Sequence, residues 1–140
     1  MKKILAISAL LVMMLLPIAS DYVSAGSITF NCFEGGKCRK YNEITLYGVT
    51  LQFSAHSVVT SQPLYYHDKI THTRTLIIAK EGSTTIRSAD TKKEPNDTYI
   101  GVLYSDGVKG RVYKGESTHY YYQASGLATV SDHSTSYTYP

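Results

Sequence analysis

The chain has 140 residues, and its 14 Lys+Arg against 11 Asp+Glu give a net charge of +3. So small and evenly spread a charge argues against a nucleic-acid-binding protein, and the length allows one hydrophobic core rather than two. Tyrosine is abundant, with 13 residues, and tryptophan is absent.

The N-terminus has the pattern of a cleaved secretory signal peptide. Lys2 and Lys3 precede an apolar run, and the small residues of Val23-Ser24-Ala25 predict cleavage after Ala25. A membrane anchor is the weaker alternative, because a spanning helix needs roughly 20 apolar residues and this run is shorter. We therefore expect residues 1–25 to be removed and residues 26–140 to form one secreted, extracellular domain without an integral membrane span.

The two cysteines, Cys32 and Cys38, lie in a segment, 26–42, that we expect to be a cysteine loop region. An even number of cysteines in an exported protein favours a disulfide, here closing a small loop that contains Gly35-Gly36. Free thiols are the alternative. The spacing is not C-x-x-C, and no histidine lies nearby to complete a zinc site. The sequence therefore predicts a structural disulfide, with no metal and no cofactor.

The rest of the chain predicts an all-β fold. His72–Lys80 is the strongest strand and is expected to be central, and 44–54 is expected to be one strand, or two joined by a glycine bulge at Gly48. Further strands are expected at 83–88, 98–105, 108–113 and 118–123, with turns at Glu81-Gly82, Ser105-Asp106-Gly107 and Lys114-Gly115-Glu116 and a polar loop over 89–97. Residues 124–140 are expected to be a last strand or a flexible tail. Short strands with frequent turns predict a small antiparallel β-sandwich.

No recognised catalytic pattern is present in the sequence. His67 and His72 have an odd separation, so they converge only if Asp68-Lys69 makes a turn, and a metal site would need further ligands. The acidic residues cluster in expected loops, and no Gly-x-Ser-x-Gly motif occurs. We expect a protein that is not an enzyme, with an extracellular hydrolase or metal-dependent protein as the least favoured alternative.

Clustered tyrosines are the better lead to function. Tyr65-Tyr66 and Tyr120-Tyr121-Tyr122 must direct rings to both faces of a strand, so some rings are expected at the surface. The alternative is that strands simply favour tyrosine and that half of the rings fill the core.

The stretch Tyr65-Tyr66-His67-Asp68-Lys69-Ile70-Thr71-His72-Thr73-Arg74-Thr75-Leu76-Ile77 resembles the Tyr–His–x4–His–Ser/Thr–x–Thr–Val signature of the lactococcin 972 family of secreted bacteriocins. The resemblance extends from about Gln62 to Gln123, through a polar loop, an aromatic strand and a tyrosine-rich strand. Where the family has a Gly-Gly-Thr-Trp-type opening, this chain has Gly35-Gly36-Lys37-Cys38.

This resemblance implies a β-sandwich that binds lipid II at the cell surface and disturbs septum formation without enzymatic turnover. Under this hypothesis Tyr65, Tyr66, His67 and His72 line the recognition surface, and Tyr120, Tyr121 and Tyr122 extend it. The alternative is a secreted binding or surface-interaction module without antibacterial activity. A homodimer is compatible with both.

Overall fold

A computed structural model describes residues 21–140, so residues 1–20 of the predicted signal peptide lie outside the described part of the chain. The described residues form eight strands and one short 3-10 helix. In chain order these are β1 (Asp21–Phe33), β2 (Gly36–Tyr47), β3 (Thr50–Ser61), η1 (Tyr66–Asp68), β4 (Ile70–Glu81), β5 (Thr84–Asp90), β6 (Thr98–Tyr104), β7 (Val112–Gln123) and β8 (Ala128–Thr138).

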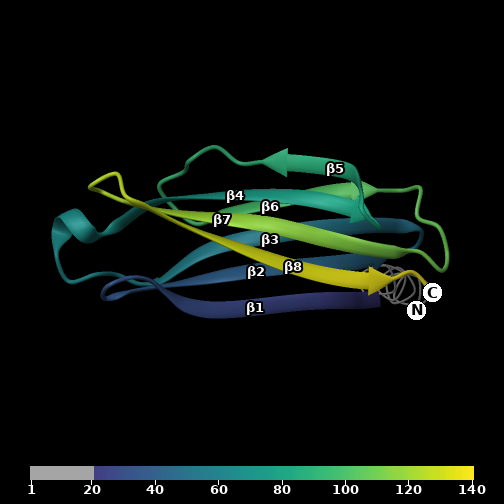
Figure 1. Ribbon diagram of the computed structural model, residues 1–140, viewed down its shortest axis with the longest axis horizontal. Helices are drawn as coiled ribbons and strands as arrows, with labels where there is room; N and C mark the ends of the chain where they lie inside the picture. Colours follow the sequence, from purple (N-terminus) through teal and green to yellow (C-terminus); the bar gives the residue numbers. More distant parts are fainter. Residues whose placement is uncertain (1–20) are drawn as a thin grey trace, which may run out of the picture.

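The strands form two antiparallel sheets that face each other across the core (Figure 1). One sheet has the order β1-β2-β3-β6 and the other has the order β5-β4-β7-β8. The all-β fold and its antiparallel pairing are therefore confirmed. β4 lies between β5 and β7, so the predicted central position of His72–Lys80 is also confirmed.

One end of the elongated sandwich carries four connections, and we call this end the tip. They are the β1–β2 turn, the β3–β4 connection with η1, the β5–β6 loop and the β7–β8 turn (Figure 1). The disulfide joins Cys32 at the end of β1 to Cys38 at the start of β2, with Cα atoms 5.7 Å apart. The predicted disulfide is thus confirmed, and it closes the β1–β2 turn at the tip.

Four predicted local features are wrong. The strand predicted at 108–113 begins only at Val112, because residues 105–111 form the loop between β6 and β7. Gly48 has φ 63° and forms the tight turn between β2 and β3, so it ends one strand rather than bulging it. Lys114-Gly115-Glu116 lies inside β7, where Gly115 is buried and a Cβ atom there would come within 3.4 Å of Thr135 Oγ1. The predicted cysteine loop region is mostly the two long strands β1 and β2, and only Glu34-Gly35 is a turn between them.

The C-terminal segment is an ordered strand rather than a flexible tail. β8 pairs with β7 along its whole length, from Tyr122↔Ala128 to Val112↔Thr138. The ring of Tyr139 is buried in the core beyond the end of β8. At the other terminus, the predicted cleavage point after Ala25 lies within β1. Processing there would leave Gly26, paired with Asn42, as the first residue of that strand.

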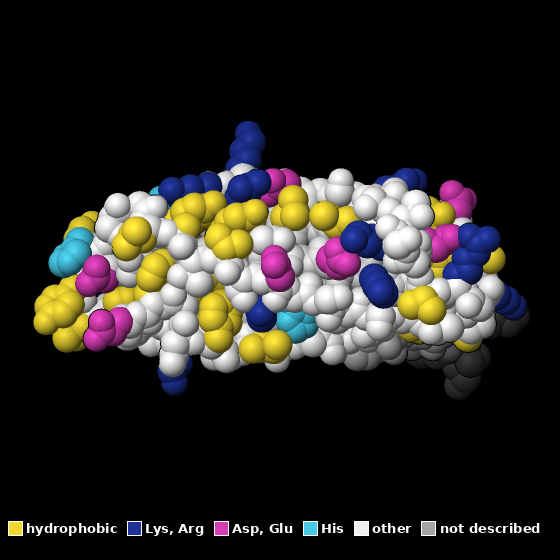
Figure 2. Space-filling view, in the orientation of Figure 1, with side chains coloured by type: hydrophobic (Ala, Val, Ile, Leu, Met, Phe, Trp, Pro, Cys, Tyr) yellow, Lys and Arg dark blue, Asp and Glu magenta, His cyan; other side chains and the backbone are white. Residues whose placement is uncertain are grey.

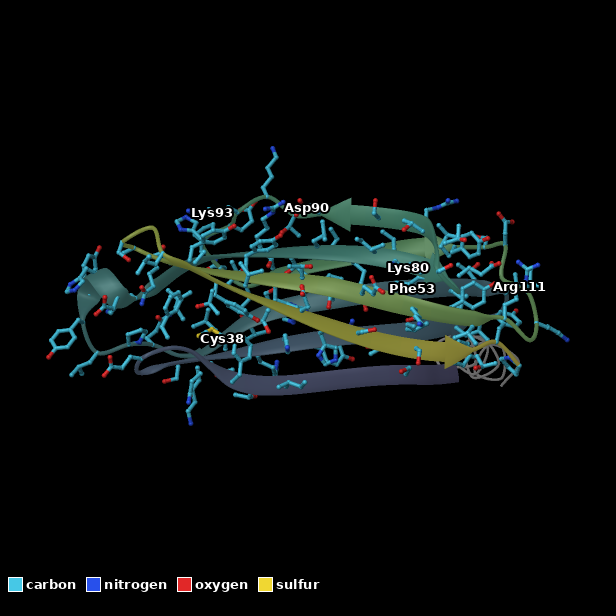
Figure 3. The ribbon with its side chains drawn as sticks, in the orientation of Figure 1. Cys38, Phe53, Lys80, Asp90, Lys93 and Arg111 are labelled. Atoms are coloured by element: carbon cyan, nitrogen blue, oxygen red, sulfur yellow. A yellow bond between two sulfur atoms is a disulfide. The ribbon has the colours of Figure 1, made fainter. Side chains whose placement is uncertain are left out.

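The core between the sheets changes character along the long axis of the molecule. An apolar cluster around Phe53, Ile77 and Tyr113 fills the end away from the tip. A second cluster at the tip consists of the disulfide, Ile70 and Tyr121. Cys38 and Phe53 are accordingly well separated along the long axis in Figure 3.

A layer of buried polar side chains separates the two apolar clusters. The Ser57 hydroxyl lies 2.7 Å from the Thr75 hydroxyl and 2.9 Å from Nδ1 of His119, and Nε2 of His119 lies 2.7 Å from the Ser117 hydroxyl. The Thr75 hydroxyl also lies 2.6 Å from that of Thr98. Burial is the largest cause that lowers the pKa of His119, from 6.5 to about 3. Its ring is therefore neutral and bridges two serines inside the sandwich.

Candidate functional site

The seven residues predicted to form one recognition surface occupy three places in the structure. Tyr65, Tyr66 and His67 lie in or beside η1 at the tip. His72, Tyr120 and Tyr122 lie on the outer face of the sheet β5-β4-β7-β8. Tyr121 lies in the core. The first two places are close, since His67 O accepts a hydrogen bond from the backbone N–H of Ser125, three residues after Tyr122.

Hydrogen bonds hold the tip connection in one shape. The Gln62 side chain accepts from the Ile70 N–H at 3.0 Å and donates to the Ile70 carbonyl at 3.2 Å, which closes the loop around η1. The Ala124 N–H donates to the Lys69 carbonyl at 2.9 Å, and the Gln123 side chain donates to the Asp68 carbonyl at 2.8 Å. The β7–β8 turn therefore supports the segment that carries Tyr65 and Tyr66.

Large side chains project into solvent from this hydrogen-bonded β3–β4 connection. Leu64, Tyr65 and Tyr66 are 87%, 65% and 82% exposed. The ring of Tyr65 stacks on that of His67, with the two ring centres 6.3 Å apart. The Lys69 ammonium lies 5.7 Å from the centre of the Tyr66 ring. Figure 2 shows hydrophobic, histidine and acidic side chains gathered at this end of the molecule. Apolar groups held in solvent by a rigid loop are typical of a contact surface.

The outer face of β7 carries a second aromatic group, flanked by cations. The rings of Tyr120 and Tyr122 are parallel within 6°, with centres 6.3 Å apart. The Arg74 guanidinium lies 4.6 Å from the centre of the Tyr120 ring, and the Lys93 ammonium lies 4.4 Å from that of Tyr122. We call these four residues the tyrosine–cation face. Figure 3 labels Lys93, which belongs to this face, and Asp90, the partner of Arg74.

An ion pair with Asp90 fixes the position of Arg74 on this face. Nε of Arg74 donates to the Asp90 carboxylate at 2.9 Å, and a second guanidinium nitrogen contacts the other carboxylate oxygen. These hydrogen bonds, together with one to Tyr122, raise the pKa of Arg74 above its ordinary value. The guanidinium is therefore held over the Tyr120 ring as a permanent positive charge.

His72 borders the tyrosine–cation face because it pairs with Tyr122 across β4 and β7. It is half-buried, and its Nδ1 lies 2.9 Å from the Thr71 hydroxyl. It also lines a pocket of about 200 Å³ with Asn96 and Asp97. η1 supplies the turn between His67 and His72, and the two histidines end in different surroundings. Within residues 21–140, no three His, Cys, Asp or Glu side chains are grouped as metal ligands.

The prediction that Tyr121 belongs to the contact surface is wrong. Its ring is fully buried, it packs edge-on against Phe30 at 5.6 Å, and its hydroxyl donates to the Arg39 carbonyl at 2.7 Å. Side chains alternate along a strand, so Tyr121 must face opposite to Tyr120 and Tyr122. Burial is the largest cause that raises its pKa above the ordinary value.

Arg74 and Lys93 were missed at the level of sequence. Arg74 could have been found, because it is two residues from His72 in the predicted strand and therefore shares its face. Lys93 carries no such signal, since it lies in the irregular β5–β6 loop and meets Tyr122 only after the chain folds.

Comparison with protein-family models, curated proteins and solved structures gives no match to this chain. The resemblance to the lactococcin 972 family therefore stays a prediction. In the part of the chain that the structure describes, no helix has the length and apolar character needed to span a membrane.

Proposed function

We propose that this protein is a secreted, bacteriocin-like protein that binds a target in the cell envelope and acts without catalysis. The observation that carries the proposal is the tyrosine–cation face, continued toward the exposed aromatic residues of the tip. Lipid II is the target that the family resemblance implies, and disturbed septum formation is the implied effect.

The chemistry of the tyrosine–cation face suits a target that combines sugar rings with phosphate groups. Tyrosine rings offer flat apolar area with a polar hydroxyl at the edge, which suits contact with sugar rings. The Lys93 ammonium can donate charge-assisted hydrogen bonds to phosphate oxygens, as can the one guanidinium nitrogen of Arg74 that Asp90 does not engage. The Cys32–Cys38 disulfide supports an extracellular place of action, because disulfides persist mainly in oxidising compartments.

The proposal is tested with protein secreted from the full-length gene and purified from the medium. We expect it to inhibit growth of a sensitive related bacterium and to bind vesicles that contain lipid II better than vesicles without it. The variant Tyr120→Ser/Tyr122→Ser should lose most of both activities, because it removes both rings of the tyrosine–cation face.

Tyr99→Ser is the matched control, because Tyr99 is 58% exposed but lies on β6, in the other sheet. It should keep both activities. Binding without growth inhibition would favour the alternative of a secreted interaction module. Absence of both activities across a broad panel of strains, or equal loss in the control, would contradict the proposal.

A further inference from the structure

A groove of about 490 Å³ lies at the tip, between the β1–β2 turn and the β3–β4 connection. Phe33, Glu34 and Gly35 form one wall, and Pro63, Tyr65 and Asp68 belong to the opposite one. This volume is in the range of small-ligand sites. The groove is separate from the tyrosine–cation face, since none of the four residues of that face lines it.

Close packing at the base of the groove sets the distance between its walls. A Cβ atom at Gly36 would come within 3.3 Å of the Pro63 ring, and one at Gly35 within 3.4 Å of Pro63 Cα. Gly35 also has φ 75°, a conformation that favours glycine. The Cys32–Cys38 disulfide closes the same turn. The groove is therefore preorganised, which lowers the entropic cost of binding.

The residues around the groove give it a negative, aromatic lining. Glu34 and Asp68 are the acidic residues of the lining, Phe33 and Tyr65 are its aromatic residues, and no Lys or Arg is among the described residues that line it. In addition, Asp68 Oδ1 lies 3.5 Å from Nε2 of the exposed His67. Lys69 follows Asp68 in the chain, but its ammonium lies over the Tyr66 ring, which does not line the groove. The two acidic residues of the lining therefore repel an anionic ligand and attract a cation.

We propose that this groove binds an organic ammonium group carried on a short apolar stem, as in a lysine side chain. The carboxylates of Glu34 and Asp68 accept charge-assisted hydrogen bonds from the ammonium. The rings of Phe33 and Tyr65 cover the stem, and their faces attract the cation. The site does not depend on the proposed envelope target, so either proposal can fail while the other stands.

Titrations of the isotope-labelled secreted protein, followed by NMR, test the site with three probes of one length. These are n-pentylammonium, 1-pentanol and pentanoate. We expect n-pentylammonium to shift the amide signals of Gly35, Leu64 and Tyr65 and to saturate at millimolar concentration. The neutral alcohol should bind about fivefold more weakly, and the anion should not bind.

Variants of the two carboxylates separate charge recognition from apolar contact. Glu34→Gln and Asp68→Asn should each weaken n-pentylammonium binding about threefold and leave 1-pentanol binding unchanged. Asp106→Asn, in the β6–β7 loop at the other end of the molecule, should change neither. Any of three results would overturn the proposal. They are equal affinity for n-pentylammonium and 1-pentanol, signal shifts confined to other regions, and no shift when n-pentylammonium is in 50-fold molar excess over protein at about 1 mM.

Discussion

His119 should make the protein lose stability as the pH falls from 7 to 5. Its ring is fully buried between two serine hydroxyls, and its pKa is lowered from 6.5 to about 3. Between these two values the unfolded chain binds a proton at this position and the folded protein does not. The free energy of unfolding therefore falls as the pH falls through this window.

The loss in the free energy of unfolding follows from the size of the pKa shift of His119. Each pH unit inside the window is worth about 1.4 kcal/mol, so acidification from pH 7 to pH 5 should cost about 2 kcal/mol from His119 alone. Burial also lowers the pKa of His56 and of His133, and this adds to the loss in the same direction. Urea unfolding at pH 7, 6 and 5, followed by circular dichroism, measures the free energy of unfolding directly.

His119→Gln isolates this contribution, because the amide keeps a hydrogen-bonding group near Ser117 and cannot titrate. The variant should be less stable than the parent at pH 7, but its loss between pH 7 and 5 should be smaller by about 2 kcal/mol. His67→Gln is the control, because His67 lies exposed at the tip. It should keep the slope of the parent. An unchanged slope in His119→Gln, or a parent whose stability is flat from pH 7 to 5, would refute the reasoning.

Three further substitutions test how the tip is held together. Replacing Cys32 and Cys38 by alanine should lower the free energy of unfolding by roughly 2 kcal/mol, because the short β1–β2 turn loses its covalent closure. Tyr121→Phe should cost about 1 kcal/mol, because the Arg39 carbonyl loses its donor. Gly35→Ala should also cost about 1 kcal/mol, because alanine is disfavoured at φ 75°. Urea unfolding at pH 7 checks all three.

Matched controls distinguish these causes from general damage. Tyr99→Phe, at an exposed position of β6, and Gly101→Ala, in an exposed strand position without positive φ, should each change stability by less than about 0.5 kcal/mol. The disulfide argument fails if the double variant unfolds at the same urea concentration as the parent. The arguments on Tyr121 and Gly35 fail if their variants match the controls.

The sequence pattern was sufficient to predict the position of a strand where the residues of that strand alone decide it. Leu76-Ile77-Ile78-Ala79 is apolar on both faces, and β4 indeed lies between β5 and β7 in its sheet. Only Ile77 and Ala79 face the core, whereas Leu76 and Ile78 are half-buried on the outer face. The alternation of side chains along β7 also places Tyr121 on the opposite face from Tyr120 and Tyr122, although the prediction grouped all three on one surface. Gly115 misled the prediction, because a glycine needed for close approach of β7 to Thr135 looks the same in sequence as a glycine in a turn.

The amino-acid pattern was enough to predict the all-β class, the central strand, the disulfide and the set of tyrosines from which the contact surfaces are drawn. These follow from period, composition and cysteine number, which are properties of short segments. The folded chain alone shows that the Lys93 ammonium lies over Tyr122 and the Arg74 guanidinium over Tyr120. It also shows that Glu34 and Asp68 line one groove. Those contacts join segments distant in the chain, and only the pairing and packing of whole strands bring such segments together.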